Sequence, residues 1–316
     1  MHLSNDHQNF LGRVDERLAH LLCLPPEEGP ADPLITAGRH LVLAGGKRAR
    51  PWLVQTLGGV VGADTPGLLD AAVAAELIHA ASLLHDDVID EGRERRGRPT
   101  ANLLWGNLTA VLSGDLLLTI ALQQLTERPP RLLHEAIAVV SVMTRASLVE
   151  AALRGQLDVT PTTWRWLAVG KTAELFGWCG AAAALLAGQE EAAERFRRGT
   201  RHLGVAFQLA NDLDDVLGRT PGKDALADLA NRSPCYPLII AASRSDRARD
   251  TLREAWDAGA DASADAVRAA VQETGADRAT IEAIALEIAE ATAALGPWVN
   301  HPATAPIFLW AEGLRR

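Results

Sequence analysis

The stretch "LLHDDVIDEGRERRGRPT", Leu83 to Thr100, places three aspartates within five positions of an apolar run and follows them with arginines. On a helix, Asp86 and Asp90 share one face and Asp87 lies beside them. Two like charges about 4 Å apart repel by roughly 4 kcal/mol at an effective dielectric near 20, so these carboxylates need a counterion. Mg²⁺ suits them, because it takes one or two carboxylates and completes its shell with substrate phosphates. The alternative is a solvated helix end that the following arginines neutralise, and this segment alone does not separate the two.

A second acidic segment favours the metal site. "FQLANDLDDVLG", residues 207–218, is an apolar helical stretch that carries Asn211, Asp212, Asp214 and Asp215. Acidic residues on apolar helices seldom serve packing alone, because burying their charge is costly. We therefore expect the two acidic segments to face each other across a cavity and to hold several Mg²⁺ ions.

Basic residues supply the opposite charge. Lys47 and Arg50 belong to a glycine-started turn before a helix, where backbone amides and the helix dipole also favour an anion. A flexible, solvated turn is the alternative for this loop. Lys171 opens an apolar segment, and Lys223 follows the second acidic segment. Two anionic groups are thus predicted, one bridged to aspartates by metal and the other held directly by Lys and Arg.

Composition excludes several other classes of protein. Ala and Leu dominate the 316 residues, and apolar positions recur at helical spacing, so the chain reads as nearly all α-helix. The net charge of −9, without a massed basic block, argues against a nucleic-acid binder. Three distant cysteines fit a reducing compartment. The N-terminus lacks a hydrophobic signal core and no uninterrupted apolar run reaches spanning length, so we expect a cytoplasmic protein without a transmembrane segment.

The predicted organisation is a single helical domain over residues 1–316, with an N-terminal extension and loop at 1–33 and a core at about 35–300. A long Ala-rich helix is expected from about Asp70 to Glu91, ending where glycines and Pro99 follow. Further helices are expected at 108–127, 131–153, 163–187, 190–217, 234–257, 262–272 and 278–295. The polar stretch 257–266 is interpreted as a loop or a helix start rather than a domain linker.

The chain resembles the trans-isoprenyl diphosphate synthases, also called the polyprenyl synthetase family. The motifs that carry the resemblance are "GGKRARP" (45–51), "LIHAASLLHDDVIDEGRERRGRPT" (77–100), "GQ" (155–156), "KTAELF" (171–176) and "FQLANDLDD" (207–215). They occur in the family's order and span roughly residues 35 to 240. The resemblance implies an all-α, isoprenoid-synthase-type bundle around a deep central cavity, usually a homodimer. It also implies head-to-tail joining of an allylic diphosphate to isopentenyl diphosphate with up to three Mg²⁺ ions.

Roles for individual residues follow from the same resemblance. The first aspartate-rich motif is Asp86, Asp87 and Asp90, with Asp86 and Asp90 as Mg²⁺ ligands on the allylic diphosphate. The second motif adds metal positions at Asn211, Asp212 and Asp215. The allylic diphosphate would also contact Arg95, Lys171 and Lys223. Isopentenyl diphosphate would be held by Lys47, Arg50, His79 and Arg96. Polar positions lining the reaction zone are Gln156, Thr172 and Gln208.

Product length is predicted from the helix that carries the first motif. Helical steps back from Asp86 lead down a stripe made of Ser82, Ile78 and Ala75, and Ala81 lies beside Ser82. Family members with bulky aromatics just before the first aspartate stop elongation early. The small residues here predict a product of geranylgeranyl length or longer, although small residues also simply allow close helix packing.

Two positions depart from the family pattern. Asn211 stands where the family normally has an aspartate, and an Asn oxygen coordinates Mg²⁺ without charge, so the third metal site should be weaker unless Asp212, Asp214 or Asp215 compensates. "NRSP" at 231–234 stands where a Gly-Lys-x-Thr element is frequent. Arg232 keeps the positive charge there and is assigned to substrate binding, with a changed donor geometry.

Three activities are compatible with these residues. The first is a chain-elongating prenyltransferase. The second transfers prenyl to another acceptor or cyclises its substrate, and it predicts loss of the isopentenyl-diphosphate residues, which are present. The third is a regulatory subunit of a heteromeric synthase, and it predicts a damaged first motif, whereas the three aspartates are intact. The residues therefore favour chain elongation.

Overall fold

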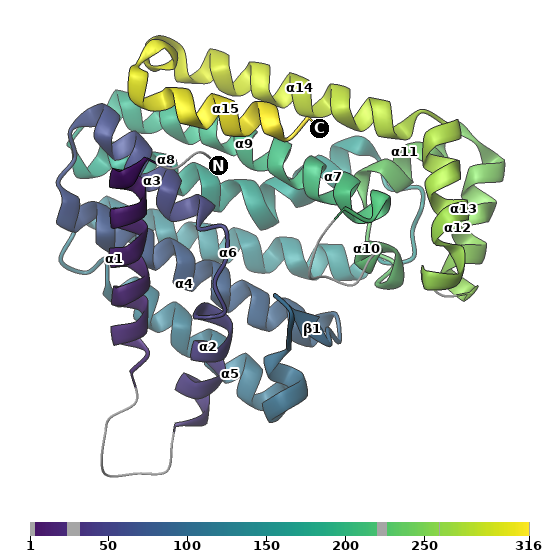
Figure 1. The fold of residues 1–316 in the computed structure, drawn as a ribbon, viewed down its shortest axis with the longest axis horizontal. Helices are drawn as coiled ribbons and strands as arrows, with labels where there is room; N and C mark the ends of the chain where they lie inside the picture. Colours follow the sequence, from purple (N-terminus) through teal and green to yellow (C-terminus); the bar gives the residue numbers. More distant parts are fainter. Residues whose placement is uncertain (1–3, 24–31, 220–225, 259, 316) are drawn as a thin grey trace.

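The computed structural model describes residues 4–23, 32–219, 226–258 and 260–315, and Figure 1 shows their arrangement. The elements are α1 (Asn5–Leu21), α2 (Pro33–Val42), α3 (Ala49–Val61), α4 (Thr65–Ile89), β1 (Glu94–Arg95), β2 (Arg98–Pro99), α5 (Ala101–Gln123), α6 (Pro130–Ala152), α7 (Pro161–Ala168), the π-helical turn η1 (Val169–Ala173), α8 (Glu174–Leu186), α9 (Glu190–Leu217), α10 (Ala227–Ala230), α11 (Tyr236–Arg244), α12 (Asp246–Ala258), α13 (Ala260–Glu273), α14 (Ala276–Leu295), the 3₁₀ turns η2 (Gly296–Asn300) and η3 (Pro302–Thr304), and α15 (Ala305–Gly313). The predicted all-α fold is confirmed.

Two apolar helices, α4 and α8, form the centre of the bundle. Both are rich in Ala and Leu and are buried over most of their length, as expected for helices that are hydrophobic all round. Helices α3, α5 and α8 pack against α4, whereas α9 packs against both α8 and α14. In Figure 1, α14 and α15 run along one side of the bundle, and α12 and α13 stand together at one end. The fold therefore buries most of α4 and leaves its last turns next to the site.

Local sequence explains where α4 begins and ends. The Asp64 carboxylate accepts a hydrogen bond from the Gly67 amide at 2.8 Å, and a proline occupies the first turn. The helix runs from Thr65 to Ile89, with Asp90 as its C-cap. It therefore starts before the predicted Asp70 and ends two residues before the predicted Glu91. A two-stranded antiparallel hairpin follows, in which Arg95 pairs with Arg98. This hairpin returns the chain towards the helix end that carries the aspartates.

Both ends of the described chain contribute to the core. Helix α1 buries Phe10, Val14 and Leu18 against α3 and α4. Near the C-terminus, Trp310 of α15 stacks on Phe176 with ring centroids 6.3 Å apart. The packed bundle thus extends beyond the predicted core of about 35–300 in both directions.

Two predicted helices are divided. The segment 163–187 forms α7, η1 and α8, because the chain makes a π-helical turn at Val169–Ala173. Such turns are often found at functional sites. The segment 234–257 is divided at Ser245, whose extended backbone separates α11 from α12. By contrast, α9 has the predicted bounds 190–217.

Three helices, α4, α5 and α6, are long and apolar enough by length and composition to cross a membrane, which differs from the expectation drawn from uninterrupted runs. The most apolar window of α4 is 72% buried inside the bundle, whereas those of α5 and α6 are only 22% and 28% buried. Exposed apolar side chains on α5 and α6 include Leu103, Leu108 and Leu148. These two helices therefore present a broad apolar surface that the chain itself leaves uncovered.

Candidate active site

The three aspartates of the first motif have different surroundings. Asp87 is 1% exposed, and its Oδ1 accepts hydrogen bonds from Arg95 Nε and Nη2 at 2.9 and 2.6 Å. Burial raises the pKa of Asp87, and the Arg95 guanidinium opposes that rise. Asp86 and Asp90, one helical turn apart, remain partly exposed on the other face. The motif thus joins one structural carboxylate to two that are accessible.

Cations from two other elements approach the accessible pair. Lys171 Nζ lies 3.9 Å from Asp86 and forms a closer ion pair with Glu150 of α6. Burial opposes the ammonium charge, but Asp86 and Glu150 outweigh it and raise the pKa of Lys171. Arg154 forms an ion pair with Asp90. The pKa of Asp90 is nevertheless raised, by burial and then by the Asp86 charge, although Lys171 and Arg154 oppose the rise. Two neighbouring carboxylates on one face offer the oxygen donors that a divalent cation such as Mg²⁺ prefers.

Asp86 and Asp90 do not by themselves make a complete metal site. Within the described ranges, no three His, Cys, Asp or Glu side chains are grouped closely enough to hold an ion by themselves. Mg²⁺ characteristically uses one or two carboxylates and takes the rest of its ligands from substrate phosphates and water. The donor set therefore fits an ion that binds together with a diphosphate.

The second motif is tied to η1 by a chain of hydrogen bonds. Thr172 Oγ1 donates to Gln208 Oε1 at 2.9 Å, and Gln208 Nε2 donates to Asp212 Oδ1 at 2.7 Å. Asp212 Oδ2 accepts from Trp164 Nε1 at 2.9 Å and from the Tyr236 amide at 3.0 Å. Protein donors thus occupy both oxygens of Asp212, which is 2% exposed.

This geometry bears on the predicted metal ligands of the second motif. Asp212 is buried and its two oxygens already accept protein hydrogen bonds, which favours a positioning role, and its assignment as a metal ligand stays a prediction. Asp215 is 6% exposed, and its Oδ2 accepts from the Asp228 amide at 3.2 Å. Asn211 and Asp214 are only half-buried. Burial raises the pKa of Asp214, and the charges opposing the rise are those of Arg219 and Lys47. Asp214 is therefore close enough to Lys47, one of the predicted isopentenyl-diphosphate residues, for the two charges to interact.

Basic residues form a second cluster one heptad earlier along α4. Burial lowers the pKa of His79 well below its ordinary value, and nearby Arg50 and Arg96 add to the effect, so His79 is neutral. The Arg50 guanidinium lies 5.0 Å from the centre of the Phe176 ring, and its buried Nε has no hydrogen-bond partner among the described residues. Lys47 is exposed, 5.9 Å from the Phe207 ring. Buried positive charge with unused donors fits an anion.

Arg96 and Arg48 fix the loop that carries this cluster. Arg96 donates to the carbonyl of Leu41 at 3.1 Å and to that of Gly45. A side chain at Gly46, whose φ is +151°, would approach the Arg96 guanidinium to 3.2 Å, which explains the glycine. Arg48, buried and left-handed at φ 47°, pairs with Glu76 at 2.7 Å and with Asp15 at 2.8 Å. The sequence motif therefore mixes residues that face the site with one that supports it.

The remaining predicted residues have mixed outcomes. Arg232 is 51% exposed, and its guanidinium lies 3.4 Å from Asp257 and from the Trp256 carbonyl, so its assignment to substrate binding stays a prediction. Gln156 is exposed in the turn after α6 and donates to the Ala152 carbonyl at 3.2 Å. Lys223 lies outside the described residues. Arg154, which contacts Asp90, was missed, because nothing in its spacing marks an arginine at a helix end.

The stripe below the first motif is packed with small side chains. Ala75, Ile78 and Ala81 are buried, and Ser82 is half-buried with its hydroxyl donating to the His79 carbonyl at 2.8 Å.

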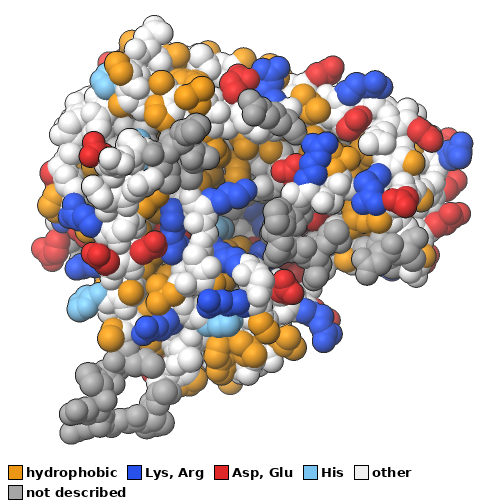
Figure 2. Space-filling view, viewed as in Figure 1, with side chains coloured by type: hydrophobic (Ala, Val, Ile, Leu, Met, Phe, Trp, Pro, Cys, Tyr) orange, Lys and Arg blue, Asp and Glu red, His pale blue; other side chains and the backbone are white. Residues whose placement is uncertain are grey.

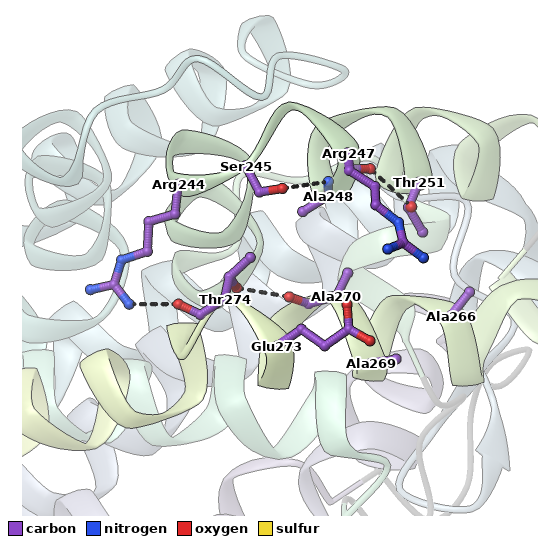
Figure 3. A pocket seen from close by; sticks show the side chains of 10 residues that line it. All are labelled: Arg244, Ser245, Arg247, Ala248, Thr251, Ala266, Ala269, Ala270, Glu273 and Thr274. Atoms are coloured by element: carbon purple, nitrogen blue, oxygen red, sulfur yellow. Dashed lines mark hydrogen bonds between the residues drawn. The ribbon is translucent and has the colours of Figure 1, made fainter.

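Figure 2 shows a hollow near the middle of one face, with Lys and Arg side chains gathered around it. A separate groove of about 550 Å³ lies between α12 and α13, and Figure 3 shows its lining. None of the groove's lining residues belongs to either acidic motif, so it is not the site described here.

An all-α bundle with two acidic helix segments and a buried cationic cluster defines a synthase that handles diphosphates. The polyprenyl synthetase family model matches residues 32–274. The chain belongs to the polyprenyl synthetase family, and the predicted membership is confirmed.

Relatives and solved structures agree with this assignment. An all-trans-nonaprenyl-diphosphate synthase (geranyl-diphosphate specific) of Rhodobacter capsulatus is 35% identical over 77% of this chain and 76% of its own length. An octaprenyl diphosphate synthase of Haemophilus influenzae is 37% identical over 70% and 69% of the two chains. A polyprenyl synthase from Caulobacter crescentus, complexed with calcium and isoprenyl diphosphate, superposes with a TM-score of 0.87 at 29% identity, covering 99% and 98% of the two chains. The prediction of a prenyltransferase is confirmed by these relatives.

Proposed function

We propose that the chain condenses an allylic diphosphate with isopentenyl diphosphate, head to tail and with Mg²⁺, to give an all-trans polyprenyl diphosphate. The observation that carries the proposal is the placement of an acidic pair and a cationic cluster at two levels of one helix. Asp86 and Asp90 end α4, and His79 lies seven residues earlier among Arg50 and Arg96. A seven-residue separation is about 10 Å along a helix axis, which suits two diphosphates brought side by side.

The proposed metal role follows from the donor set. Asp86 and Asp90 would hold Mg²⁺ together with the allylic diphosphate, and Asn211 would supply a neutral oxygen from α9. Bound Mg²⁺ supplies Lewis-acid stabilisation of the diphosphate that leaves. We propose up to three Mg²⁺ ions. The Caulobacter relative complexed with calcium supports binding of a divalent cation, whereas the number of ions rests on the resemblance.

The chain's own residues perform the remaining tasks. Lys171, fixed by Glu150 in the π-helical turn, stabilises negative charge that develops on the leaving diphosphate. The residues that orient isopentenyl diphosphate are Arg50, His79 and Arg96. The two arginines supply positive charge, and neutral His79 donates a hydrogen bond without adding charge. The apolar bundle around Ala81 and Phe207 excludes water from the allylic cation. The departed diphosphate accepts the final proton, so no side-chain base is required.

We propose a product of geranylgeranyl length or longer. The relatives are named for products of different length, including nonaprenyl, octaprenyl and farnesyl diphosphates, so membership in the family leaves the length open. The support is local: the side chains of Ala81 and Ser82, just before the first motif, are small, and an aromatic ring at either position would fill more of the space below the motif.

We propose a homodimer that forms through α5 and α6. Leu108 is 74% exposed on α5 and Leu148 is 73% exposed on α6, within the broad apolar surface described above. Covering such a surface removes apolar area from water. Light scattering at micromolar concentration should give twice the chain mass. A cytoplasmic location is proposed because the described residues contain no disulfide.

Incubation with labelled isopentenyl diphosphate, Mg²⁺ and each of dimethylallyl, geranyl and farnesyl diphosphate tests the activity. Chain elongation predicts labelled products of at least twenty carbons. Incorporation of prenyl into another acceptor, or a cyclic hydrocarbon, would support altered chemistry instead. No product with any primer would support a regulatory subunit.

A further inference from the structure

Arg154 occupies a fixed position directly after α6. Its neighbour Gly155 has φ +77°, a left-handed conformation that favours glycine, and the Gly155 amide donates to the Arg232 carbonyl at 2.8 Å. The turn therefore ties the backbone beside Arg154 to the segment that carries Arg232. The side chain is 25% exposed, so it lies at the edge of the site and not on open surface.

The guanidinium of Arg154 makes two contacts with the end of α4. Nη2 forms an ion pair with Asp90, and Nη1 donates to the Ile89 carbonyl at 3.1 Å. A cation at a helix C-terminus also interacts favourably with the helix dipole. The remaining nitrogen, Nε, is buried and has no hydrogen-bond partner among the described residues. Arg154 thus neutralises Asp90 while keeping one donor unused.

The same Asp90 carboxylate is a proposed Mg²⁺ ligand, so Arg154 and the metal compete for it. A divalent cation between Asp86 and Asp90 would lie next to the guanidinium, and the two positive charges would repel each other. The diphosphate that accompanies the metal carries oxygens that accept N–H donors, and the planar fork of arginine matches phosphate geometry.

We propose that Arg154 is an exchangeable counterion: it neutralises Asp90 in the free protein and turns to the allylic diphosphate when metal takes Asp90. The inference rests on the proposed function for the identity of that diphosphate. Arg154 would thereby bring a positive charge to the substrate, the role predicted from sequence for Arg232, whose side chain contacts α12. Arg154 would accordingly have opposite effects on the two ligands.

Calorimetry on the full chain separates these effects. Mg²⁺ is titrated into the protein alone, and inorganic diphosphate is titrated into protein with saturating Mg²⁺. In Arg154→Gln, affinity for Mg²⁺ alone should rise about fivefold because the competing cation is gone, and affinity for diphosphate should fall about tenfold because a donor is lost. A purely structural arginine would lower both affinities or neither, and either result would overturn the proposal.

Two further variants complete the test. Arg154→Lys keeps the charge but cannot donate to the Asp90 carboxylate and the Ile89 carbonyl at the same time. Each of its two affinities should therefore be intermediate between the values for wild type and Arg154→Gln. It also serves if Arg154→Gln does not fold. Arg253→Gln, at an exposed position of α12, is the matched control and should leave both titrations unchanged. Absence of elongated product from the wild type would reject the proposed function, whereas the two titrations would still decide the role of Arg154.

Discussion

Arg95 donates two hydrogen bonds, at 2.9 and 2.6 Å, to a single oxygen of Asp87, and thereby fastens the hairpin to the last turn of α4. Asp87 Oδ1 also lies against Gly92, where an added Cβ would approach it to 3.1 Å. The pair holds the chain that carries Arg96 next to the aspartates. The opposed charges of this segment are therefore only partly self-neutralising: Asp87 and Arg95 pair, whereas Asp86 and Asp90 face the site.

Asp87→Ala should destabilise the fold, because it leaves Arg95 without its buried partner. We expect the free energy of unfolding to fall by about 3 kcal/mol, as for other broken buried pairs. Urea denaturation followed by circular dichroism measures it. The control is Asp246→Ala, whose partner pair with Arg249 lies at the surface and should give no measurable change. Equal stability of the two variants would contradict a structural role for Asp87.

Much of this arrangement followed from sequence, and the rest depended on tertiary contacts. Helical spacing correctly placed Asp86 and Asp90 on one face, because that relation is fixed within one helix. Spacing could not show that Asp212 points inward, since Trp164 and Tyr236, which fix it, come from α7 and α11. Nor could it show that Arg232 turns towards α12 while Arg154 reaches Asp90. Both outcomes depend on the packing of distant segments.

Asn211→Asp should let the enzyme work at lower Mg²⁺ concentrations. Protein donors occupy both oxygens of Asp212, whereas Asn211 is only half-buried, and a carboxylate at 211 would add charge near the proposed ion. We expect the half-saturating Mg²⁺ concentration to fall at least about fivefold, in steady-state rates measured across a Mg²⁺ series. Asn211→Ala should shift it the other way. An unchanged Mg²⁺ dependence in both would remove Asn211 from the metal site.

Glu287 should make stability depend on pH. Burial alone would raise its pKa, but hydrogen bonds from His202 at 2.6 Å and from Arg165 at 2.8 Å outweigh burial and lower it. A carboxylate with a lowered folded pKa contributes stability that is present above its unfolded pKa, about 4.3, and is lost as pH falls through the folded value.

Thermal unfolding from pH 6 to pH 3 measures this dependence. Glu287→Gln should lower the melting temperature at pH 6 and flatten its decline below about pH 4.3. Tyr236 also acts on Glu287 and does not change charge in this range. The hydrogen-bond partners His202 and Arg165 are present in both proteins. Parallel declines in wild type and variant would show that Glu287 does not contribute.

Ser82→Phe should shorten the product. Ser82 is half-buried one turn before Asp86, and Ile78 and Ala75 below it are buried, so a phenyl ring there would take up the space into which we propose that the chain grows. With farnesyl diphosphate as primer, we expect wild type to release products of twenty carbons or more, and Ser82→Phe to accumulate shorter ones. Ser82→Ala, which removes the hydroxyl that bonds the His79 carbonyl but keeps the space, separates volume from hydrogen bonding. It should retain the wild-type distribution by chromatography of the dephosphorylated alcohols. If Ser82→Phe also retained it, the growing chain would have to run elsewhere than along this face of α4.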